Sequence, residues 1–357
     1  MIRNLRNLII MNNLFSVTPS QAKKFTELCM KAHLVPYLQG SPGVGKSSIV
    51  KQIAKEYSLE LIDCRLSTME PCDLVGLPFF NNGKAEFQPY SFYPFEDTPI
   101  PKGKAGFLLF FDEFNSAPRG VQAAAYKTIL DREIGQKKLH PECYVVAAGN
   151  KMTDGAITNK LSTAMSSRVI HLNMEISFDD WMDFAVKNQI DEKVLAYLSM
   201  YPDKLMVFDP DKDEQTFCSP RTWEFVSKLI KANGGKIKGL TEVLAGAITG
   251  SQASAFVQFC KVYADLVTIQ DIVQNPDISC STDKATQFAI MIHLTNKTDV
   301  KNLPVVIKWA KKNFVPTIAL SFLRNLNSRY SSLDDNPLLG IPEYVENMQE
   351  LSKYMMG

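Results

Sequence analysis

Short apolar runs alternate with segments of helical periodicity from residue 34 to about residue 173. Each run is nearly continuous in its apolar character, which is typical of strands that are buried on both faces of a sheet. The strands predicted from these runs are residues 35–39, 59–63, 106–111, 144–148 and 169–172. Because strands that alternate with helices form parallel sheets, the pattern predicts an α/β fold with a parallel five-stranded sheet sandwiched by helices.

After residue 175 the strand pattern stops and helical periodicity takes over. The helices predicted there are residues 178–187, 191–200, 220–232, 240–248, 251–264, 283–295, 303–312, 315–326 and 342–354. We therefore expect an α/β domain over residues 1–175, an α-helical lid over 176–265 and a C-terminal helical extension over 266–357. An irregular stretch rich in Pro, Phe, Gly and Asn interrupts the α/β domain around 71–104, and its length is typical of a functional loop or an insertion.

Aromatic residues lie at helical spacing in the expected lid. They are Trp181, Phe184, Trp223 and Phe225. Aromatic side chains at such spacing more often pack in a core than form a site for stacked bases. We therefore expect these four residues to belong to the core of the lid.

Residues 40–47 directly follow the first predicted strand and read Gly-Ser-Pro-Gly-Val-Gly-Lys-Ser, the G-x-x-x-x-G-K-[ST] pattern of a phosphate-binding loop. Backbone N–H groups wrap a polyphosphate only where no side chain intrudes, and the helix predicted at residues 46–56 points the positive end of its dipole at the same anion. We expect Lys46 to reach the β- and γ-phosphates and Ser47 to hold Mg²⁺. The residues expected to bind the nucleotide are Gly40, Ser41, Pro42, Gly43, Val44, Gly45, Lys46, Ser47 and Ser48. The alternative is a glycine turn without ligand, but the flanking strand and helix favour a P-loop NTPase.

Two carboxylates, Asp112 and Glu113, directly follow the apolar run at residues 107–111. Hydrolysis of a γ-phosphate needs a divalent cation to neutralise charge and a group that orients and deprotonates water. We expect Asp112 to join Ser47 in holding Mg²⁺, and Glu113 to activate the water. Strands often end in solvated carboxylates, and it is the upstream phosphate loop that favours the catalytic interpretation.

The strand predicted at residues 144–148 ends in Gly149 and Asn150. A short neutral amide at that tip is able to hold the attacking water between itself and Glu113. The alternative role for Asn150 is to cap the following turn, as asparagine often does. Because this strand belongs to the same predicted sheet as the strand before Asp112, we favour the catalytic role.

These motifs, in this order and spacing, resemble the Walker A, Walker B and sensor 1 motifs of the AAA+ ATPases. Residues 65–78 are similar to the segment that enters the insertion of the MoxR-type branch, and residues 219–223 resemble its sensor 2 motif. The resemblance covers roughly residues 30–265 and implies an ATPase that converts ATP and water to ADP and phosphate. It also implies ATP and Mg²⁺ as ligands, and a homo-oligomeric, hexameric ring whose active sites are shared between subunits.

The resemblance implies roles for two arginines. Arg168 stands where the family carries its arginine finger, which completes the ATP site of the neighbouring subunit. Ser167 and Val169 depart from the Asp-Arg-Phe or Asn-Arg-Phe of many relatives, while the guanidinium is retained. Arg221 stands in the sensor 2 motif and is implied to contact the nucleotide from the lid of the same subunit. The alternatives are a surface salt bridge for Arg168 and an ordinary residue of a first helical turn for Arg221.

The function implied by the resemblance is that of a MoxR-like chaperone, an ATP-driven remodelling machine with a von Willebrand factor A domain protein as its partner. A hairpin with Lys137 and Lys138 is implied to face the pore of the ring, although two solvated lysines on a turn are the plainer interpretation. The alternatives are a nucleic-acid motor or loader, similar to helicases or clamp loaders, and a nucleotide-gated scaffold without turnover. Glu113 and Arg168 argue against the scaffold, because an ATPase without turnover usually loses one of these two groups.

Composition and charge narrow these alternatives. The 39 basic and 38 acidic residues leave a net charge of +1, so no global field attracts nucleic acid or an anionic membrane. The seven cysteines form no C-x-x-C pair and there are only four histidines, which argues against zinc and disulfides and favours free thiols in a reducing cytoplasm. No apolar stretch reaches the roughly 18 residues needed to span a bilayer. Residues 1–11 faintly resemble a signal peptide, but their apolar core is too short, and Met11 is a second candidate start.

Overall fold

The computed structural model describes residues 16–154, 159–209, 211, 214–263, 267–330 and 336–346. Residues 1–11, with their resemblance to a signal peptide, and the C-terminal part of the helix predicted at 342–354 lie outside the described residues. The chain divides into two compact units, Met1–Asp180 with Asp209–Asp213, and Trp181–Phe208 with Glu214–Gly357. The separation of a lid over 176–265 from an extension over 266–357 stays a prediction.

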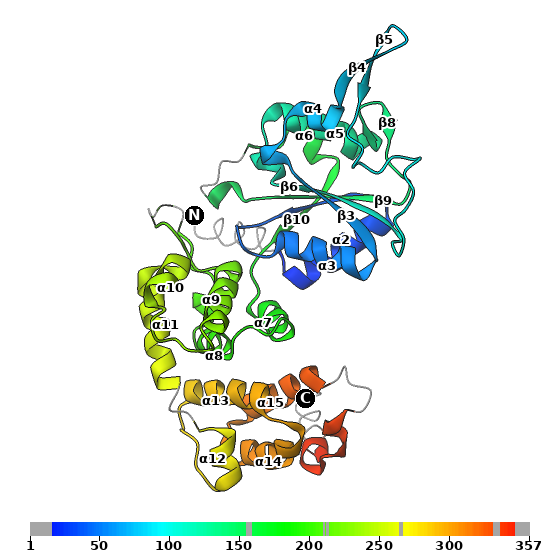
Figure 1. The fold of residues 1–357 in the computed structure, drawn as a ribbon. Helices are drawn as coiled ribbons and strands as arrows, with labels where there is room; N and C mark the ends of the chain where they lie inside the picture. Colours follow the sequence, from blue (N-terminus) through cyan, green and yellow to red (C-terminus); the bar gives the residue numbers. More distant parts are fainter. Residues whose placement is uncertain are drawn as a thin grey trace, which may run out of the picture. The chain divides into compact units, whose positions relative to one another are not determined.

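A parallel sheet of six strands lies at the centre of the first unit, in the order β1-β10-β2-β9-β6-β3 (Figure 1). Its strands are β1 Ser16–Val17, β2 Val35–Gln39, β3 Leu59–Arg65, β6 Gly106–Asp112, β9 Cys143–Gly149 and β10 Val169–Met174. Every residue of β6 is buried, which accounts for its continuous apolar run. The predicted α/β fold is confirmed. The sheet has one strand more than the five expected, because β1 spans only two residues and leaves no apolar run.

Helices cover both faces of this sheet (Figure 1). The helices of the first unit are α2 Pro19–Lys31, α3 Lys46–Glu56, α4 Pro71–Val75, α5 Arg119–Asp131 and α6 Thr163–Ser166. Successive side chains of a strand point to opposite faces, so Leu108 and Phe110 of β6 share a core with α2 and α3. Leu109 and Phe111 share the other core with α5. The two cores hold the strands in one layer and leave the carboxyl ends of the strands together at one edge.

Two local signals mark elements that the apolar pattern does not predict. Thr18 and Gln21 form a capping box at the start of α2. The stretch around 71–104, expected to be irregular, contains an antiparallel hairpin of β4 Leu77–Asn81 and β5 Lys84–Gln88, so that expectation is wrong in part. Asn82 and Gly83 connect these strands with φ of 50° and 76°, the left-handed conformation of a two-residue hairpin turn that an Asn-Gly dipeptide favours.

The second unit is helical, and α7 Phe178–Lys187 leads into it. Its further helices are α8 Glu192–Met200, α9 Pro220–Ala232, α10 Thr241–Ile248, α11 Gly250–Tyr263, α12 Ile269–Gln274, α13 Lys284–Lys297, α14 Leu303–Asn313 and α15 Pro316–Tyr330. Trp223 is fully buried against the rings of Tyr197 and Phe256, and Trp181 is also buried. The expected core position is confirmed for both tryptophans and is wrong for Phe225, which is 44% exposed. Among the helices that the structure describes, none is both long and apolar enough to cross a membrane.

Candidate functional site

The phosphate-binding loop at residues 40–47 connects β2 to α3. Gly43 and Gly45 have φ of 82° and 100°, which favour glycine because it has no Cβ. A Cβ on Gly40 would lie 3.1 Å from the main-chain oxygen of Met174, so this position also leaves little room for a side chain. Gly45 caps α3 without a side-chain hydrogen bond, which leaves the first N–H groups of the helix available to an anion. The loop therefore fits a polyphosphate.

Lys46, the first residue of α3, is buried with its ammonium among three oxygens. Its Nζ lies 2.5 Å from the main-chain oxygen of Gly40, 3.1 Å from that of Ser41 and 3.0 Å from Oδ1 of Asn150. A buried ammonium needs such partners, because its desolvation would otherwise be costly. The structure thus brings Lys46 and Asn150, predicted from separate motifs, into direct contact at the carboxyl edge of the sheet.

Ser47 and Asp112 also meet at this edge. The Ser47 hydroxyl donates to Oδ2 of Asp112 at 2.8 Å, and the main-chain N–H of Glu113 donates to Oδ1 at 2.8 Å. Asp112 is only 7% exposed, and within the part of the chain that the structure describes it forms no ion pair. A buried carboxylate without a cation is costly, and a hydroxyl beside a carboxylate is a donor set that suits Mg²⁺. The residues present therefore fit the predicted metal.

The Glu113 carboxylate contacts two residues that the sequence analysis does not single out. The hydroxyl of Ser67 donates to its Oε2, and Nε of Arg65 lies 3.6 Å from its Oε1. Both residues lie near Glu113 because β3 pairs with β6, with Arg65 in register with Asp112. Partial desolvation, helped by the nearby Asp112 carboxylate, raises the pKa of Asp63 on the same strand. The predicted base is thus held by the end of a neighbouring strand.

Residues 37–173 match the family model of the AAA domain (dynein-related subfamily). The chain carries an AAA domain. The match begins in β2 and ends in β10, so it includes the phosphate loop, Asp112, Glu113 and Asn150. The AAA+ resemblance expected from the sequence is confirmed at this level, whereas membership of the MoxR-type branch stays a prediction.

Solved structures similar to this chain include the Holliday junction branch migration motor RuvB of Thermotoga maritima and NtrX of Brucella abortus in complex with ADP. RuvB is 16% identical, the match covers 68% of this chain and 69% of RuvB, and the TM-score is 0.33. NtrX is 12% identical, the match covers 93% of this chain and 67% of NtrX, and the TM-score is 0.38. With TM-scores this low, neither protein identifies a function for this chain.

Arg168 is exposed on the AAA domain, directly after α6. Its Nη1 donates to the main-chain oxygen of Ala164 at 2.6 Å, and its guanidinium lies 5.0 Å from the centre of the Tyr126 ring. Within the described residues it makes no hydrogen bond or ion pair with the phosphate loop. Stacking on an aromatic face orients a guanidinium while leaving it charged. Its role as an arginine finger stays a prediction.

Two other predicted features lie away from the loop. Arg221 is exposed in the first turn of α9, in the second unit, where Ser219 caps the helix, and its contact with nucleotide stays a prediction. The expected hairpin is confirmed in the AAA domain as β7 Glu133–Ile134 and β8 Lys137–Lys138. Both lysines are exposed, and Lys137 lies 5.3 Å from the centre of the Phe95 ring. Their contact with a substrate stays a prediction.

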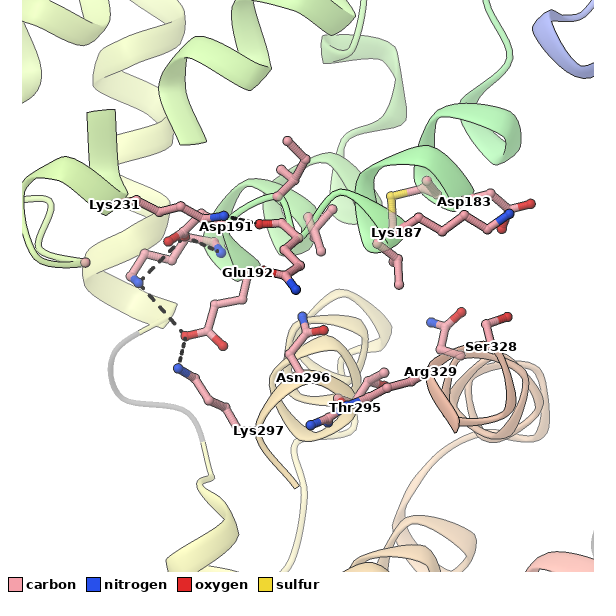
Figure 2. Close-up of a pocket in the computed structure, with 18 residues that line it drawn as sticks. Asp183, Lys187, Asp191, Glu192, Lys231, Thr295, Asn296, Lys297, Ser328 and Arg329 are labelled. Carbon is pink, nitrogen blue, oxygen red and sulfur yellow. Dashed lines mark hydrogen bonds and ion pairs between the residues drawn. The ribbon is translucent and has the colours of Figure 1, made fainter. Parts of the chain in front are cut away.

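The second unit contains a pocket of about 800 Å³, lined by charged as well as apolar residues, that no sequence motif predicts. Figure 2 shows it between α7 and α8 on one side and α13 and α15 on the other. Glu192 of α8 forms an ion pair with Lys297 of α13, whose Nζ lies 3.8 Å from Oε1. Nδ1 of His293 lies 3.7 Å from Oε2 of the same carboxylate. Glu192 is thus paired with basic groups beside the pocket, and we assign no ligand to the pocket.

Proposed function

We propose that the protein is an ATP-hydrolysing AAA+ remodelling ATPase, a MoxR-like chaperone that acts as a ring. The observation that supports hydrolysis is the convergence of three strand ends on one loop. At the ends of β2, β6 and β9, Lys46 lies within hydrogen-bond distance of Asn150, and Ser47 within hydrogen-bond distance of Asp112. This set matches the needs of phosphoryl transfer, which depends on positioning and on charge stabilisation.

The phosphate loop would bind and orient the triphosphate. The N–H groups at the start of α3 and the Lys46 ammonium would donate to phosphate oxygens, and Lys46 would exchange its present oxygen partners for them. Ser47 and Asp112 would hold Mg²⁺, which when bound supplies positive charge that offsets the charge developing on the γ-phosphate. The loop residues thus place the phosphorus atom in a fixed position relative to Glu113.

Glu113 would accept the proton of the attacking water, and the Asn150 amide would hold that water by a hydrogen bond. The Glu113 carboxylate must turn away from Ser67 and Arg65 before it can accept a proton from water. Its backbone φ of 55° places the residue in a left-handed turn just past the end of β6. We infer that Glu113 has two positions, the restrained one of this structure and a catalytic one in which its carboxylate has left Ser67 and Arg65.

The active site would be completed by Arg168 of a neighbouring subunit. Arg168 is exposed and keeps its charge while it lies against Tyr126, so it is accessible to another copy of the chain. An arginine aimed at a transferring phosphoryl group accelerates hydrolysis by about 10³ to 10⁵. Arg221 would contact the nucleotide from the lid. Movement of the lid would then be passed to a von Willebrand factor A domain protein in the cytoplasm.

A nucleic-acid motor or loader is the alternative function. Such a protein usually carries a basic surface, whereas this chain has a net charge of +1. Stimulation of ATP turnover by DNA, with a steep loss on adding salt, would favour the alternative. Turnover that is independent of DNA but changes with a protein partner would favour the remodelling ATPase.

The test of hydrolysis is phosphate release by the purified protein with Mg²⁺ and ATP. Glu113→Gln should bind ATP with nearly unchanged affinity, should lower turnover by at least about 100-fold, and should stabilise rings in size-exclusion chromatography. Glu242→Gln removes an exposed carboxylate of α10 by the same chemical change and should retain wild-type turnover. If the wild type shows no turnover at any protein concentration, the proposal fails.

A further inference from the structure

Asn115 is a buried amide that bridges two of the predicted motifs. It lies in the short 3₁₀ turn Phe114–Ser116, two residues after Glu113, and is only 2% exposed. Its Nδ2 donates to the main-chain oxygen of Asn150 at 2.7 Å, and its Oδ1 accepts from the main-chain N–H of Asn150 at 3.0 Å. The side chain thus pairs with both main-chain polar groups of Asn150, as a peptide group of a neighbouring strand would do.

The end of the β6–β9 ladder explains why such a side chain is needed. The register of β6 with β9 ends at Phe111 paired with Ala147. Past that point the left-handed Glu113 turns the chain out of the sheet, so β6 offers no further main-chain partner to β9. Buried main-chain groups without a partner are costly, and the Asn115 amide takes the place of the missing strand. It therefore extends the pairing of β9 as far as Asn150.

Gly149 leaves the space that the Asn115 amide occupies. A Cβ at Gly149 would lie 2.4 Å from Oδ1 of Asn115 and 2.2 Å from the hydroxyl of Tyr37. Contacts this short do not occur between real side chains, so a larger residue at 149 would displace the amide or the tip of β9. The absence of a side chain at Gly149 is therefore required for the Asn115 amide to reach the main chain of Asn150.

We propose that Asn115 is a positioning residue for ATP hydrolysis, which fixes the tip of β9 so that the Asn150 side chain faces Lys46 and the γ-phosphate position. The inference rests on the proposed function and deepens it. The Asn150 side chain already lies 3.0 Å from Nζ of Lys46, and its aim is set by main-chain groups that Asn115 holds. Asn115 acts on the reaction through Asn150 alone, since its side chain is paired with that residue.

A double-mutant cycle on turnover tests this assignment. Asn115→Ala should lower kcat by at least about tenfold and change KM for ATP by less than about threefold, because a misplaced catalytic group costs rate while the phosphate loop still binds. Asn150→Ala should lower kcat at least as much. In the double variant, kcat should equal that of Asn150→Ala within about twofold, because two residues that act through one contact are not additive.

Two further variants separate positioning from stability. Asn159→Ala removes another amide near the same turn, one whose Nδ2 donates to Ala117 at 3.1 Å and not to Asn150, and it should retain kcat. Asn115→Ser adds no buried charge and keeps a polar group, but it is too short to pair with both main-chain groups of Asn150, so it should fold even where Asn115→Ala does not. Its kcat should fall by about three- to tenfold with KM for ATP unchanged, and this loss should vanish in the Asn150→Ala background.

Losses that multiply in the double variants would overturn the inference, because they would show that Asn115 acts elsewhere. A folded Asn115→Ala protein with wild-type kcat would also overturn it, and would leave the proposed hydrolysis intact. A wild type without turnover would refute the proposed function and the inference together. Circular dichroism melting curves of each variant identify any loss of kcat that comes from unfolding.

Discussion

Replacement of Ser67 by alanine should raise the basal rate of ATP hydrolysis. The Ser67 hydroxyl donates to Oε2 of Glu113, so it stabilises the carboxylate in a position where it does not activate water. Removal of this donor leaves Arg65 as the remaining restraint, at 3.6 Å from Oε1. The restrained position should then be less populated, and the catalytic position more so.

The expected size of the effect follows from the surroundings of the carboxylate. A hydrogen bond to a charged group contributes about 1.5 to 3 kcal/mol. The Glu113 side chain is 38% exposed, so water replaces part of the lost contact and the lower end of that range applies. At about 1.4 kcal/mol for each factor of ten, the lower end of the range corresponds to a rise in kcat of about tenfold. The Arg65 pair is exposed on both sides and should contribute less, at most about 1 kcal/mol.

The assay is phosphate release at saturating ATP, without a partner protein, with Ser67→Ala beside wild type. Ser91→Ala, an identical change at an exposed serine, is the matched control and should leave kcat unchanged. A fall in kcat on Ser67→Ala would refute the reasoning, because it would show that Ser67 orients Glu113 for catalysis. An unchanged kcat would mean that the contact does not restrain Glu113 during turnover.

Two further predictions concern the subunit interface and the charge at the sheet edge. Arg168→Ala should lower kcat by about 10³ without loss of ATP binding. Mixing it with Glu113→Gln protein should restore part of the turnover, since one variant supplies Glu113 and the other Arg168. A mixture without any restored turnover would argue against a shared site. Partial desolvation and the nearby Asp112 carboxylate raise the pKa of Asp63 although this residue is exposed, so its contribution to stability is full below the unfolded value near 3.8 and is lost as pH rises through the higher folded value. Asp63→Asn should therefore raise Tm at pH 7 and leave it nearly unchanged at pH 3 in melting curves followed by circular dichroism, and an equal shift at both pH values would contradict this linkage.

Elements with a strong local signal could be predicted closely from the sequence. The predicted bounds of α3 and α9 match the structure, because Gly45 ends the loop before α3 and Ser219 with Pro220 begins α9. The apolar runs also locate the five longer strands of the sheet, of which β2, β6 and β9 are buried over nearly their whole length. The apolar pattern does not predict the hairpin β4–β5 although its Asn-Gly turn is a local signal, since Pro78 lies inside the apolar run of β4 and argues against a strand.

The residues that contact Glu113 and Asn150 could not be predicted in the same way. Ser67 and Asn115 have no motif of their own, and each acts on a partner from another segment of the chain. Their positions follow from strand order, since β6 lies between β3 and β9, and this order is not contained in the apolar pattern. A motif search finds groups that touch the nucleotide, because the phosphates fix their spacing along the chain. Groups that act through another residue need only lie beside it in the sheet, so the fold is required to find them.

The order of these strands also separates the contacts of the Glu113 carboxylate from those of Asn150. Glu113 stands at the end of β6, between the ends of two other strands that carry different contacts. On the β3 side, Ser67 and Arg65 bind the carboxylate itself and hold it back. On the β9 side, Asn115 binds only main-chain groups of Asn150, so it fixes the frame without touching Glu113. The contacts of the Glu113 carboxylate and of the Asn115 amide are therefore made toward the ends of two different strands, β3 and β9.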